Sequence, residues 1–533
     1  MERIKYVQLA LVIWFLFSLV PVTGFSWTAP TGIPTPSWPA GGIDQERPAL
    51  PNPWSSEQAG WYFVSSTGCS DSRTYGYPSM ARCSIPSSPA AGSKIILDGT
   101  VSGDQMISFS GTAGAPIWIM TYNTNLKASV SGVWELAGNF LILDSLTFNS
   151  GSNCDGNLAM TGTSQVVRDS TFANTCTAKF GAGVAMGGTN VVFYNNIISQ
   201  QGNWQLTTDV DRHGIKVYGG SDIWIVDSAL YHCQGDGVQV GDQNNAPNAI
   251  NRVYVGRNTV YENLQSCLWT KNATDVIFSQ NTCYDITFSN GGVGQGMGGQ
   301  YDAGFVWFLF NEIYNTKSGI HIAGASNGGG GPWYAIGNVI YNVQSDTCNE
   351  YDYGALGYRN EGGFYAFHNT IYDVDSFLTL APSVGSIVIK DNIFASKKAG
   401  LCPAIDAGAE APAMDYNLYS TANQSVEYNG AIYDSISSFA SATSQESNRQ
   451  VANPLFTGAP PDFSLQSGSP ALGNANQSIE TAYELFSTRY GRSIQYDFSG
   501  NVRPRDTWDI GAYEYGSIRS GRPAAPRNVR VVF

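Results

Sequence analysis

The stretch "DRHGIKVYGGSDIWIVDSALYHCQGDGVQVGD" (Asp211 to Asp242) contains one pattern twice. "HGIKV", which ends at Val217, and "DGVQV", which ends at Val240, both alternate apolar and polar residues. An apolar, β-branched run, "IWIV", lies between them. Alternation with a period of two is typical of β-strands, because successive side chains point to opposite faces of a sheet. The stretch therefore predicts short strands that recur along the chain.

The same phrase recurs from about Ile95 onwards, as an apolar run, a small polar residue and two or three further apolar residues. The copies are "FLILDSLTF", "VVRDSTF", "VVFYNNII", "IWIVDSAL", "VYVGRNTV", "VIFSQNTC", "VWFLFNEI", "YAIGNVI", "FYAFHNTI" and "IVIKDNIF". Their polar residues are Ser145, Ser170, Asn196, Ser228, Asn258, Asn281, Asn311, Asn338, Asn369 and Asn392, at spacings of 23 to 32 residues. A period in this range is typical of a solenoid, in which each unit buries its apolar face on its neighbours.

The repeat unit contains strands and no helical periodicity, so the predicted fold is all-β: a parallel β-helix with about ten or more coils. We expect the Asn/Ser position to lie at a turn, where side-chain amides can hydrogen-bond along the stack. Asparagine also tolerates the left-handed backbone geometry of such corners. The composition agrees, because 13% charged residues, 13% aromatic residues and 59 glycines favour many short strands joined by turns.

The net charge of -14 argues against a general nucleic-acid binder, because contacts with phosphates need a basic surface. An acidic polysaccharide would likewise need a local basic patch or bound cations. At the start of the chain, Arg3 and Lys5 precede an apolar run and then small residues near Thr23 to Ser26. This pattern predicts a secretory signal peptide over residues 1–25, with an uncleaved anchor as the alternative. We therefore expect a secreted, extracellular or cell-surface protein with no stable membrane span after cleavage.

The predicted domain organisation follows composition. Residues 26–60 are rich in proline and predict an extended linker, residues 61–410 the β-helix, 411–515 C-terminal coils or a capping module, and 516–533 a tail. Nine cysteines in an exported chain indicate disulfides, and the odd number leaves at least one thiol unpaired or intermolecular. Cys69 with Cys83 and Cys154 with Cys176 are plausible local pairs. A structural zinc site is not expected, because the sequence has no CxxC pair.

The coil phrase and its period resemble the right-handed parallel β-helix of the pectate-lyase-like superfamily. "SGTAGAPIWIMTYN" (Ser110 to Asn123) is similar to the first coils of its secreted bacterial members. "PDFSLQSGSPALGNA" and "DFSGNVRPRDTWDIGAYEY" resemble their C-terminal module. The resemblance covers roughly Ile95 to Tyr515. It implies a right-handed fold, and in the superfamily's lyases a basic residue and calcium-binding acids on the exposed strands of the middle coils. It assigns no reaction, because this scaffold carries lyases, hydrolases, esterases and adhesins.

One strand of each coil carries a row of candidate functional residues. In register, these strands read "GVAMG", "GIKVY", "GVQVG", "CLWTK" and "GIHIA". The residues expected to point inward are Ile215, Val217, Val238, Val240, Leu268, Thr270, Ile320 and Ile322, and those expected to point outward are Ala185, Lys216, Gln239, Trp269 and His321. Longer connections at 200–211, 241–251, 324–333 and 345–353 flank this strand, so we expect loops that wall a groove.

The first functional hypothesis is a polysaccharide lyase that acts by β-elimination. Lys216 or Lys271 would be the base that removes a proton next to a uronate carboxylate, which requires a neutral lysine. Nearby positive charge or desolvation would favour that form, and Arg212 and His213 are close enough in sequence to contribute. The alternative is that both lysines are ordinary solvated side chains. Gln239, Trp269, His321 and Arg359 are the candidate substrate-binding residues, with ordinary surface roles as their alternative.

Aspartates at the ends of two neighbouring strands support three further interpretations. Asp209, Asp211 and Asp242 could ligate calcium, which prefers clustered oxygen ligands and would neutralise a uronate carboxylate. Asp211, Asp236 or Asp242 could instead form an acid/base pair for glycoside hydrolysis. They could also be turn residues that accept hydrogen bonds from backbone amides. The non-catalytic hypothesis is a glycan-binding or structural protein, with end-to-end self-association through the open edges of the solenoid.

Overall fold

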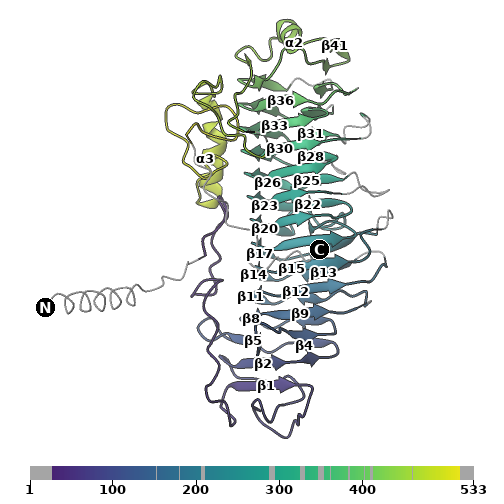
Figure 1. Cartoon of the computed structure of the whole chain (residues 1–533), viewed down its shortest axis with the longest axis vertical. Helices are drawn as coiled ribbons and strands as arrows, with labels where there is room; N and C mark the ends of the chain where they lie inside the picture. The colour runs from purple at the N-terminus through teal and green to yellow at the C-terminus, as the bar shows by residue number, and fades with distance from the viewer. Residues whose placement is uncertain are drawn as a thin grey trace, which may run out of the picture.

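The computed structural model describes residues 27–516 except 152, 179–180, 206–209, 287–293, 325–329, 346–347, 349–352, 361, 382–384, 401, 409–411 and 459. The predicted signal peptide and nearly all of the predicted tail therefore lie outside the described residues. The described chain forms a long solenoid of three sheets, each with 14 strands (Figure 1). The prediction of an all-β parallel solenoid with ten or more coils is confirmed.

Each coil contributes one strand to each sheet, and we name the sheets I, II and III in the order in which the chain visits them. Sheet I consists of β1 (Trp61–Ser65), β2 (Lys94–Asp98), β5 (Ile117–Thr121), β8 (Leu141–Asp144), β11 (Thr163–Arg168), β14 (Thr189–Tyr194), β17 (Ser221–Val226), β20 (Ile250–Gly256), β23 (Ala273–Ser279), β26 (Gly304–Leu309), β29 (Trp333–Ile336), β32 (Phe364–Phe367), β35 (Ile387–Lys390) and β38 (Ala413–Asp415). These are the apolar runs of the sequence repeat.

Sheet II follows the Asn/Ser position of the repeat. It consists of β3 (Thr100–Val101), β6 (Ala128–Val130), β9 (Leu146–Asn149), β12 (Thr171–Asn174), β15 (Ile197–Gln201), β18 (Ala229–Cys233), β21 (Thr259–Tyr261), β24 (Thr282–Tyr284), β27 (Glu312–Thr316), β30 (Val339–Val343), β33 (Thr370–Val374), β36 (Ile393–Lys397), β39 (Leu418–Tyr419) and β42 (Gln450–Val451).

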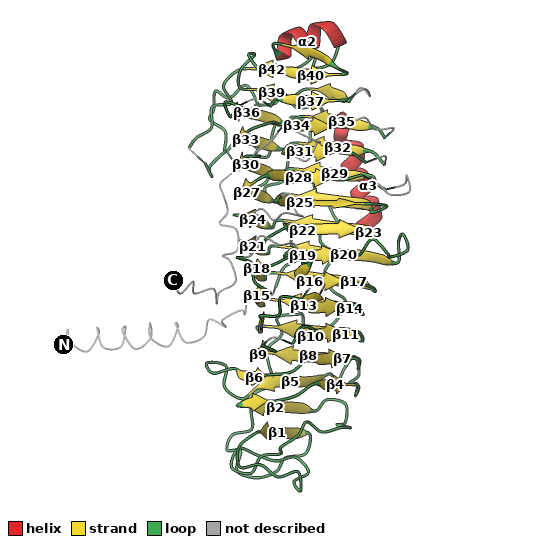
Figure 2. Cartoon of the chain, turned by 90° about the vertical axis from the view of Figure 1, so that its right-hand side faces the viewer, coloured by secondary structure: helices red, strands yellow, loops and turns green. Residues whose placement is uncertain are grey.

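Sheet III carries the row of candidate functional residues. It consists of β4 (Gln105–Ile107), β7 (Trp134–Leu136), β10 (Leu158–Met160), β13 (Gly181–Met186), β16 (Arg212–Val217), β19 (Val238–Val240), β22 (Ser266–Lys271), β25 (Gln295–Gln300), β28 (Ser318–Ile322), β31 (Gly354–Tyr358), β34 (Leu378–Leu380), β37 (Ile405–Ala407), β40 (Val426–Tyr428) and β41 (Ala431–Tyr433). The pairings are parallel except for the terminal β40–β41 hairpin. Figure 2 shows the three strands of each coil stacked along the long axis.

The asparagines of the repeat form a hydrogen-bonded ladder at the corner between sheets I and II, as the sequence predicts. The Nδ2 group of Asn281 donates to Asn311 Oδ1 at 3.1 Å, and that of Asn311 donates to Asn338 Oδ1 at 3.0 Å. These side chains are completely buried. The expected left-handed geometry, however, belongs to the preceding residue, for example Gln280 (φ 58°) and Phe310 (φ 53°). The reason is that the backbone N–H of each ladder asparagine also donates to the next amide, which fixes its own orientation.

The outer face of sheet I is covered by both ends of the described chain. Residues 27–54 form no helix or strand and lie against sheet I: Trp224 Nε1 donates to Pro34 O at 2.7 Å, and Arg168 Nη1 donates to Ile43 O at 2.9 Å. Near the other end, Phe486 of helix α3 (Glu480–Tyr490), which follows the short 3-10 helix η1 (Gln477–Ile479), packs edge-on against Trp307. Figure 1 shows both segments along one side of the solenoid.

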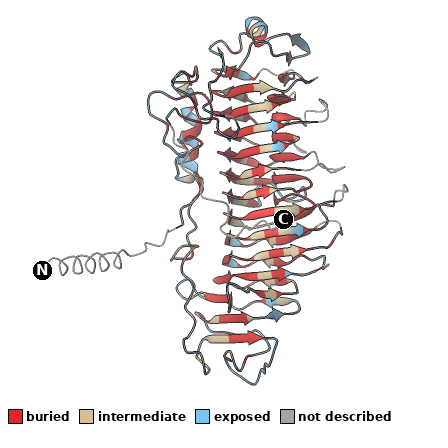
Figure 3. Ribbon diagram, in the orientation of Figure 1, coloured by how far each residue is buried: buried red, intermediate tan, exposed pale blue. Residues whose placement is uncertain are grey.

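The C-terminal end of the solenoid is closed by helix α2 (Ile436–Thr443), which buries Ile436 and Phe439 over the last coils. Most strand residues are buried, as Figure 3 shows, because one apolar core runs through the coils. Within the described part of the chain, no helix is long and apolar enough to cross a membrane.

Four disulfides are present, and they include both of the pairs predicted from sequence. These pairs are Cys69–Cys83, Cys154–Cys176, Cys267–Cys283 and Cys348–Cys402. Cys233 is the remaining thiol; it is buried, and burial raises its pKa. Four disulfides fit an extracellular protein, because such bonds persist in oxidising compartments. A buried thiol with a raised pKa is a poor nucleophile.

Candidate functional site

The outer face of sheet III carries the predicted column. Ala185 pairs with Lys216, Lys216 with Gln239, and Gln239 with Trp269, so these outward residues lie on successive coils. The residues predicted to point inward, such as Ile215 and Val238, have no exposed surface. The alternation of the sequence therefore predicted both faces of these strands.

A glycine separates Trp269 from His321 in the column, which the sequence reading missed. Gly298 pairs with both residues, and its strand reads "QGMGGQ", which lacks the apolar alternation that marks the other strands. A Cβ atom at Gly298 would lie 1.9 Å from the carbonyl oxygen of His321 and 2.5 Å from the Trp269 ring. Only glycine fits here, and the Trp269 and His321 rings lie nearly parallel with centroids 6.4 Å apart.

Three charged groups meet on adjacent coils of this face. Lys216 Nζ lies 2.6 Å from Asp242 Oδ2, and Lys271, at the end of β22, also acts electrostatically on Asp242. Asn272 Nδ2 donates to the Asp242 carbonyl at 3.0 Å. The turn at Gly241 (φ 81°) comes so close to the backbone of Lys271 that a Cβ there would lie 1.8 Å from its carbonyl oxygen. The backbone therefore fixes Asp242 between the two lysines.

The pKa of Asp242 is lowered. Partial burial would raise it, but hydrogen bonds from Lys216 and the Asn244 backbone, with the charges of both lysines, outweigh that effect. Asp242 is therefore ionised at neutral pH and forms an ion pair with Lys216. No ion pair joins Lys271 to another residue in the described parts of the chain. The two lysines thus differ, since Lys216 has a carboxylate partner at contact distance and Lys271 does not.

The middle of the column is polar and nevertheless enclosed. Gln239 is 2% exposed, and its Oε1 atom has no hydrogen-bond partner among the described residues. Trp269 is 5% exposed and donates from Nε1 to Gln300 Oε1 at 3.1 Å, and His321 is buried. A buried acceptor that lacks a donor costs free energy, and a ligand hydroxyl or a water molecule would satisfy it. Gln239 Oε1 is therefore the polar atom of this face that most clearly needs a hydrogen-bond donor.

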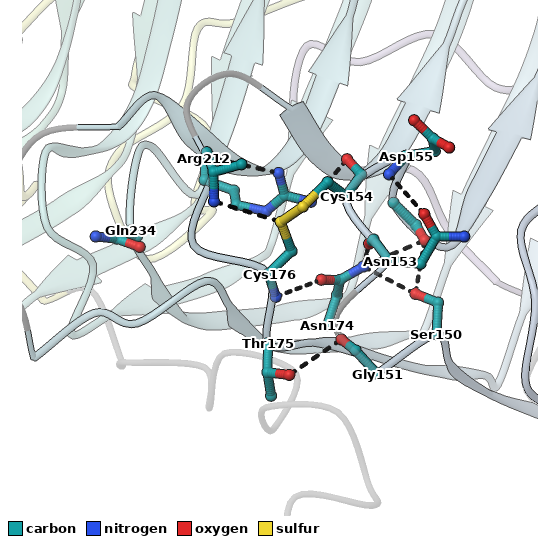
Figure 4. Close-up of a disulfide and its surroundings, with 12 residues drawn as sticks. Ser150, Gly151, Asn153, Cys154, Asp155, Asn174, Thr175, Cys176, Arg212 and Gln234 are labelled. Carbon is teal, nitrogen blue, oxygen red and sulfur yellow. Dashed lines mark hydrogen bonds between the residues drawn. A yellow bond between two sulfur atoms is a disulfide. The ribbon is translucent and has the colours of Figure 1, made fainter.

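Arg212, His213 and Asp236, predicted as catalytic, lie away from this cluster. Arg212 is completely buried beside the Cys154–Cys176 disulfide and donates from Nη2 to the Cys154 carbonyl at 3.0 Å (Figure 4). His213 and Asp236 are also buried, and the Asp236 backbone N–H donates to His213 Nδ1 at 3.0 Å. Asp236 Oδ2 also lies 3.3 Å from His213 Nδ1, so the two buried side chains contact each other directly. These contacts indicate structural roles.

The structure does not gather the aspartates predicted to bind calcium. Asp211 precedes β16 and accepts a hydrogen bond from Gln265 Nε2 at 3.1 Å, whereas Asp242 follows β19, at the opposite ends of neighbouring parallel strands. A strand of this length spans roughly 15–20 Å, so the two carboxylates cannot share one ion or one glycosidic bond. Asp209 lies outside the described residues, among which no group of three or more His, Cys, Asp or Glu residues could hold a metal.

Other polar residues flank the column. Arg359, predicted to bind substrate, is exposed just after β31, and its backbone N–H donates to Ile322 O. Sequence reasoning missed Glu135, which precedes Ala159 and Ala185 in the same column, and Tyr218, whose pKa is raised by burial and by the charge of Glu135. The alternation of "VWELAG" could have revealed Glu135.

Comparisons with known proteins concern the fold. No protein-family model matches the chain, and no curated protein matches it. Among solved structures, the pectate lyase Pel9A is 15% identical, with a TM-score of 0.42, over 85% of this chain and 96% of that chain. XylC in complex with xylose is 9% identical, with a TM-score of 0.47, over 85% and 99%.

A third structure is the A-module of the mannuronan C-5 epimerase AlgE4 from Azotobacter vinelandii. It is 14% identical, with a TM-score of 0.39, over 60% of this chain and 87% of that chain. The parallel β-solenoid rests on the strand pairings of this chain itself. At these identities the likeness assigns no activity to this chain.

Proposed function

We propose that the chain is an exported carbohydrate-active protein and that the outer face of sheet III cleaves an acidic polysaccharide by β-elimination. The observation that carries the proposal is the pair of inequivalent lysines around Asp242. The chain is acidic as a whole, with a net charge of -14, so two lysines on either side of one coil, β19, form a local concentration of positive charge. Four disulfides support export.

In the proposed reaction, the two lysines have different tasks. Lys216, held in place by its ion pair with Asp242, contacts the uronate carboxylate and stabilises the negative charge that develops next to it. Lys271 takes the proton from C5, the C5 electron pair forms the C4–C5 double bond, and the C4–O bond breaks, with the leaving oxygen taking up a proton from water. Gln239 Oε1 accepts a hydrogen bond from a sugar hydroxyl. No step is assigned to calcium, because the described carboxylates do not form a site for it.

The test is ultraviolet absorbance of the unsaturated product when the mature protein is mixed with a panel of polyuronates, with and without calcium or a chelator. We expect an increase on at least one polymer that Lys271→Ala abolishes, because the base is lost. Lys216→Ala should raise KM, because the uronate carboxylate loses its partner, and lower kcat, because the developing charge is no longer stabilised. The matched control is Lys94→Ala, which removes a lysine from sheet I and should leave the rate unchanged. An increase that survives Lys271→Ala would refute the assignment of the base.

A non-catalytic glycan-binding function is the second candidate, and the burial of Gln239, Trp269 and His321 favours it. Buried side chains position a ligand well but give limited access for turnover. Binding of a polyuronate by calorimetry, weakened by Lys216→Ala and without product from any polymer, would support this function over elimination. Hydrolysis by paired aspartates is not proposed, because Asp211 and Asp242 lie at opposite strand ends and Asp236 is buried.

A further inference from the structure

A second surface, on the outer face of sheet II, carries one tyrosine on each of several successive coils. The stacked rings are Tyr231, Tyr261, Tyr284, Tyr314 and Tyr341. Neighbouring ring centroids lie 4.9 to 5.0 Å apart, and the ring planes differ by only 2° to 11°. The stack is a consequence of the parallel register, which places each tyrosine directly over the tyrosine of the previous coil.

The stack has defined ends. Below Tyr231, the same position is Ser199, which carries no ring. At the upper end, Phe463 of the C-terminal module packs against Tyr341 and against Tyr372 of the next coil, with centroids 5.4 Å from each. The rings not covered by Phe463 are Tyr231, Tyr261, Tyr284 and Tyr314, which span three strand spacings, or about 14 Å. We name these four side chains the tyrosine stripe.

The stripe presents hydroxyl groups and ring edges, because the ring faces pack against one another. Its side chains are half-buried. Burial, with the neighbouring Tyr314 and the charges of Asp285 and Glu262, raises the pKa of Tyr284 to about 12, and burial with the charges of Glu312 and Asp285 raises that of Tyr314 to about 12. These hydroxyls therefore stay protonated at ordinary pH and can both donate and accept hydrogen bonds.

A row of polar side chains runs beside the stripe, one residue further along each strand. His232 Nε2 lies 2.8 Å from Glu262 Oε2, and Asn315 Nδ2 donates to Asp285 Oδ1 at 2.7 Å. The Trp204 ring stacks on His232 with centroids 4.1 Å apart, so the aromatic surface continues towards the connection that enters β16. The flanking charges of this row are carboxylates, whereas the proposed site on sheet III carries lysines.

We propose that the tyrosine stripe binds a neutral, linear, β-linked polysaccharide along the axis of the solenoid. An extended chain of equatorially linked pyranoses advances by about one strand spacing per sugar, so each sugar meets one hydroxyl. Carboxylates beside the stripe repel a polyuronate. A strip about 14 Å long and one side chain wide is too small for a stable protein partner, which needs about 800 Å² per side. This surface does not depend on the lyase proposal.

The experiment is native affinity electrophoresis of the full mature chain in gels that contain soluble cellulose derivatives, xylan or polygalacturonate. The test variant combines Tyr261→Phe, Tyr284→Phe and Tyr314→Phe, which keeps the rings and removes three hydroxyls. We expect retardation in at least one neutral gel and about tenfold weaker binding by the triple variant, because several hydrogen bonds are lost together. The matched control is Tyr122→Phe with Tyr515→Phe, at exposed tyrosines elsewhere.

Each outcome decides the proposal. Retardation that is lost in the triple variant and kept in the control and in Lys271→Ala supports it, and separates the stripe from sheet III. The proposal is overturned if no neutral polymer retards the chain, if the triple variant binds as the parent does, or if the stripe is what binds polygalacturonate. A dimer in sedimentation that the triple variant loses would also overturn it, in favour of self-association. Thermal unfolding of each variant checks that the fold is kept.

Discussion

The outer faces of sheets I and III share one backbone geometry and differ in what covers them. Outward residues of sheet I are large and apolar, for example Ile142, Trp224 and Trp307, and both ends of the described chain pack over them. Those of sheet III include small and polar residues such as Ala185, Lys216 and Gln239, although Met106 and Trp269 also lie on this face. In a β-helix the inward residues of every sheet are apolar, so they do not distinguish one face from another. The outward residues do: they separate a face that the chain itself covers from a face that is available to a ligand.

The largest effect expected from this difference is on stability at sheet I. Trp307→Ala should lower the free energy of unfolding by about 3–5 kcal/mol, because it leaves a cavity beneath α3. The Trp307 ring has no exposed surface, stacks on Tyr334 with centroids 3.7 Å apart, and donates from Nε1 to Tyr490 OH at 3.0 Å. Urea unfolding measures the loss, and limited proteolysis reports whether α3 detaches.

The control is Met106→Ala on sheet III. Met106 is outward, precedes Glu135 in the column and is 68% exposed. Its removal should change stability by less than about 0.5 kcal/mol. Equal losses from the two substitutions would contradict the view that sheet I is a covered face and sheet III an open one.

The fold could be predicted from sequence because the same sequence pattern recurs in each coil. The asparagines from Asn258 to Asn392 mark the same corner in successive units, and alternation around Lys216 and Gln239 fixed which side chains point outward. Which segments of the chain cover sheet I could not be predicted in this way. The proline-rich segment has the composition of a linker, and only contacts such as Arg168 Nη1 with Ile43 O reveal that it lies on sheet I.

For the site, only the residues that belong to the alternating apolar and polar pattern could be predicted from sequence. Lys216, Lys271 and Asp242 are neighbours because three coils stack in register, which the repeat implies. Arg212 and His213 are the first two residues of β16, but their environment depends on the disulfide beside Arg212 and on the turn at Asp236. Proximity in sequence does not tell whether a side chain at a corner points to the groove or into the coil end.

The second prediction concerns the closed end of the solenoid. Glu446 is completely buried, ends the asparagine ladder by accepting from Asn417 Nδ2 at 2.7 Å, and accepts from Tyr419 OH at 2.7 Å. Burial raises its pKa from 4.5 to about 7. Because the folded state keeps this proton while the unfolded state releases it, stability is full below about pH 4.5 and falls by about 3 kcal/mol as the pH rises to about 7.

Glu446→Gln should remove this part of the pH dependence, since an amide can still accept both hydrogen bonds and never ionises. Urea unfolding at about pH 4 and about pH 8 gives the measurement, and the variant should exceed the parent in stability at the higher pH by up to about 3 kcal/mol. Glu514, whose pKa is also raised to about 7 by burial, accounts for pH dependence that remains. The exposed Glu427→Gln serves as the control, and a variant with the parent's full pH dependence would show that Glu446 is not the group responsible.

The smallest effect on stability is expected at the open face. Asp242→Asn removes the ion pair with Lys216, but these side chains are 31% and 26% exposed, so the loss should stay below about 1 kcal/mol. Because the pKa of Asp242 is lowered in the folded state, its contribution is present above the unfolded pKa and disappears as the pH falls through the folded value. Between about pH 5 and pH 8 the variant should therefore be less stable than the parent in urea unfolding by a constant amount, and the two should converge at lower pH. Its affinity for a polyuronate should change much more, since Lys216 loses the carboxylate that holds it in place. If stability falls sharply while polyuronate binding is unaffected, the ion pair stabilises the solenoid and does not serve binding. That result would contradict the view that sheet III is an open, ligand-binding face.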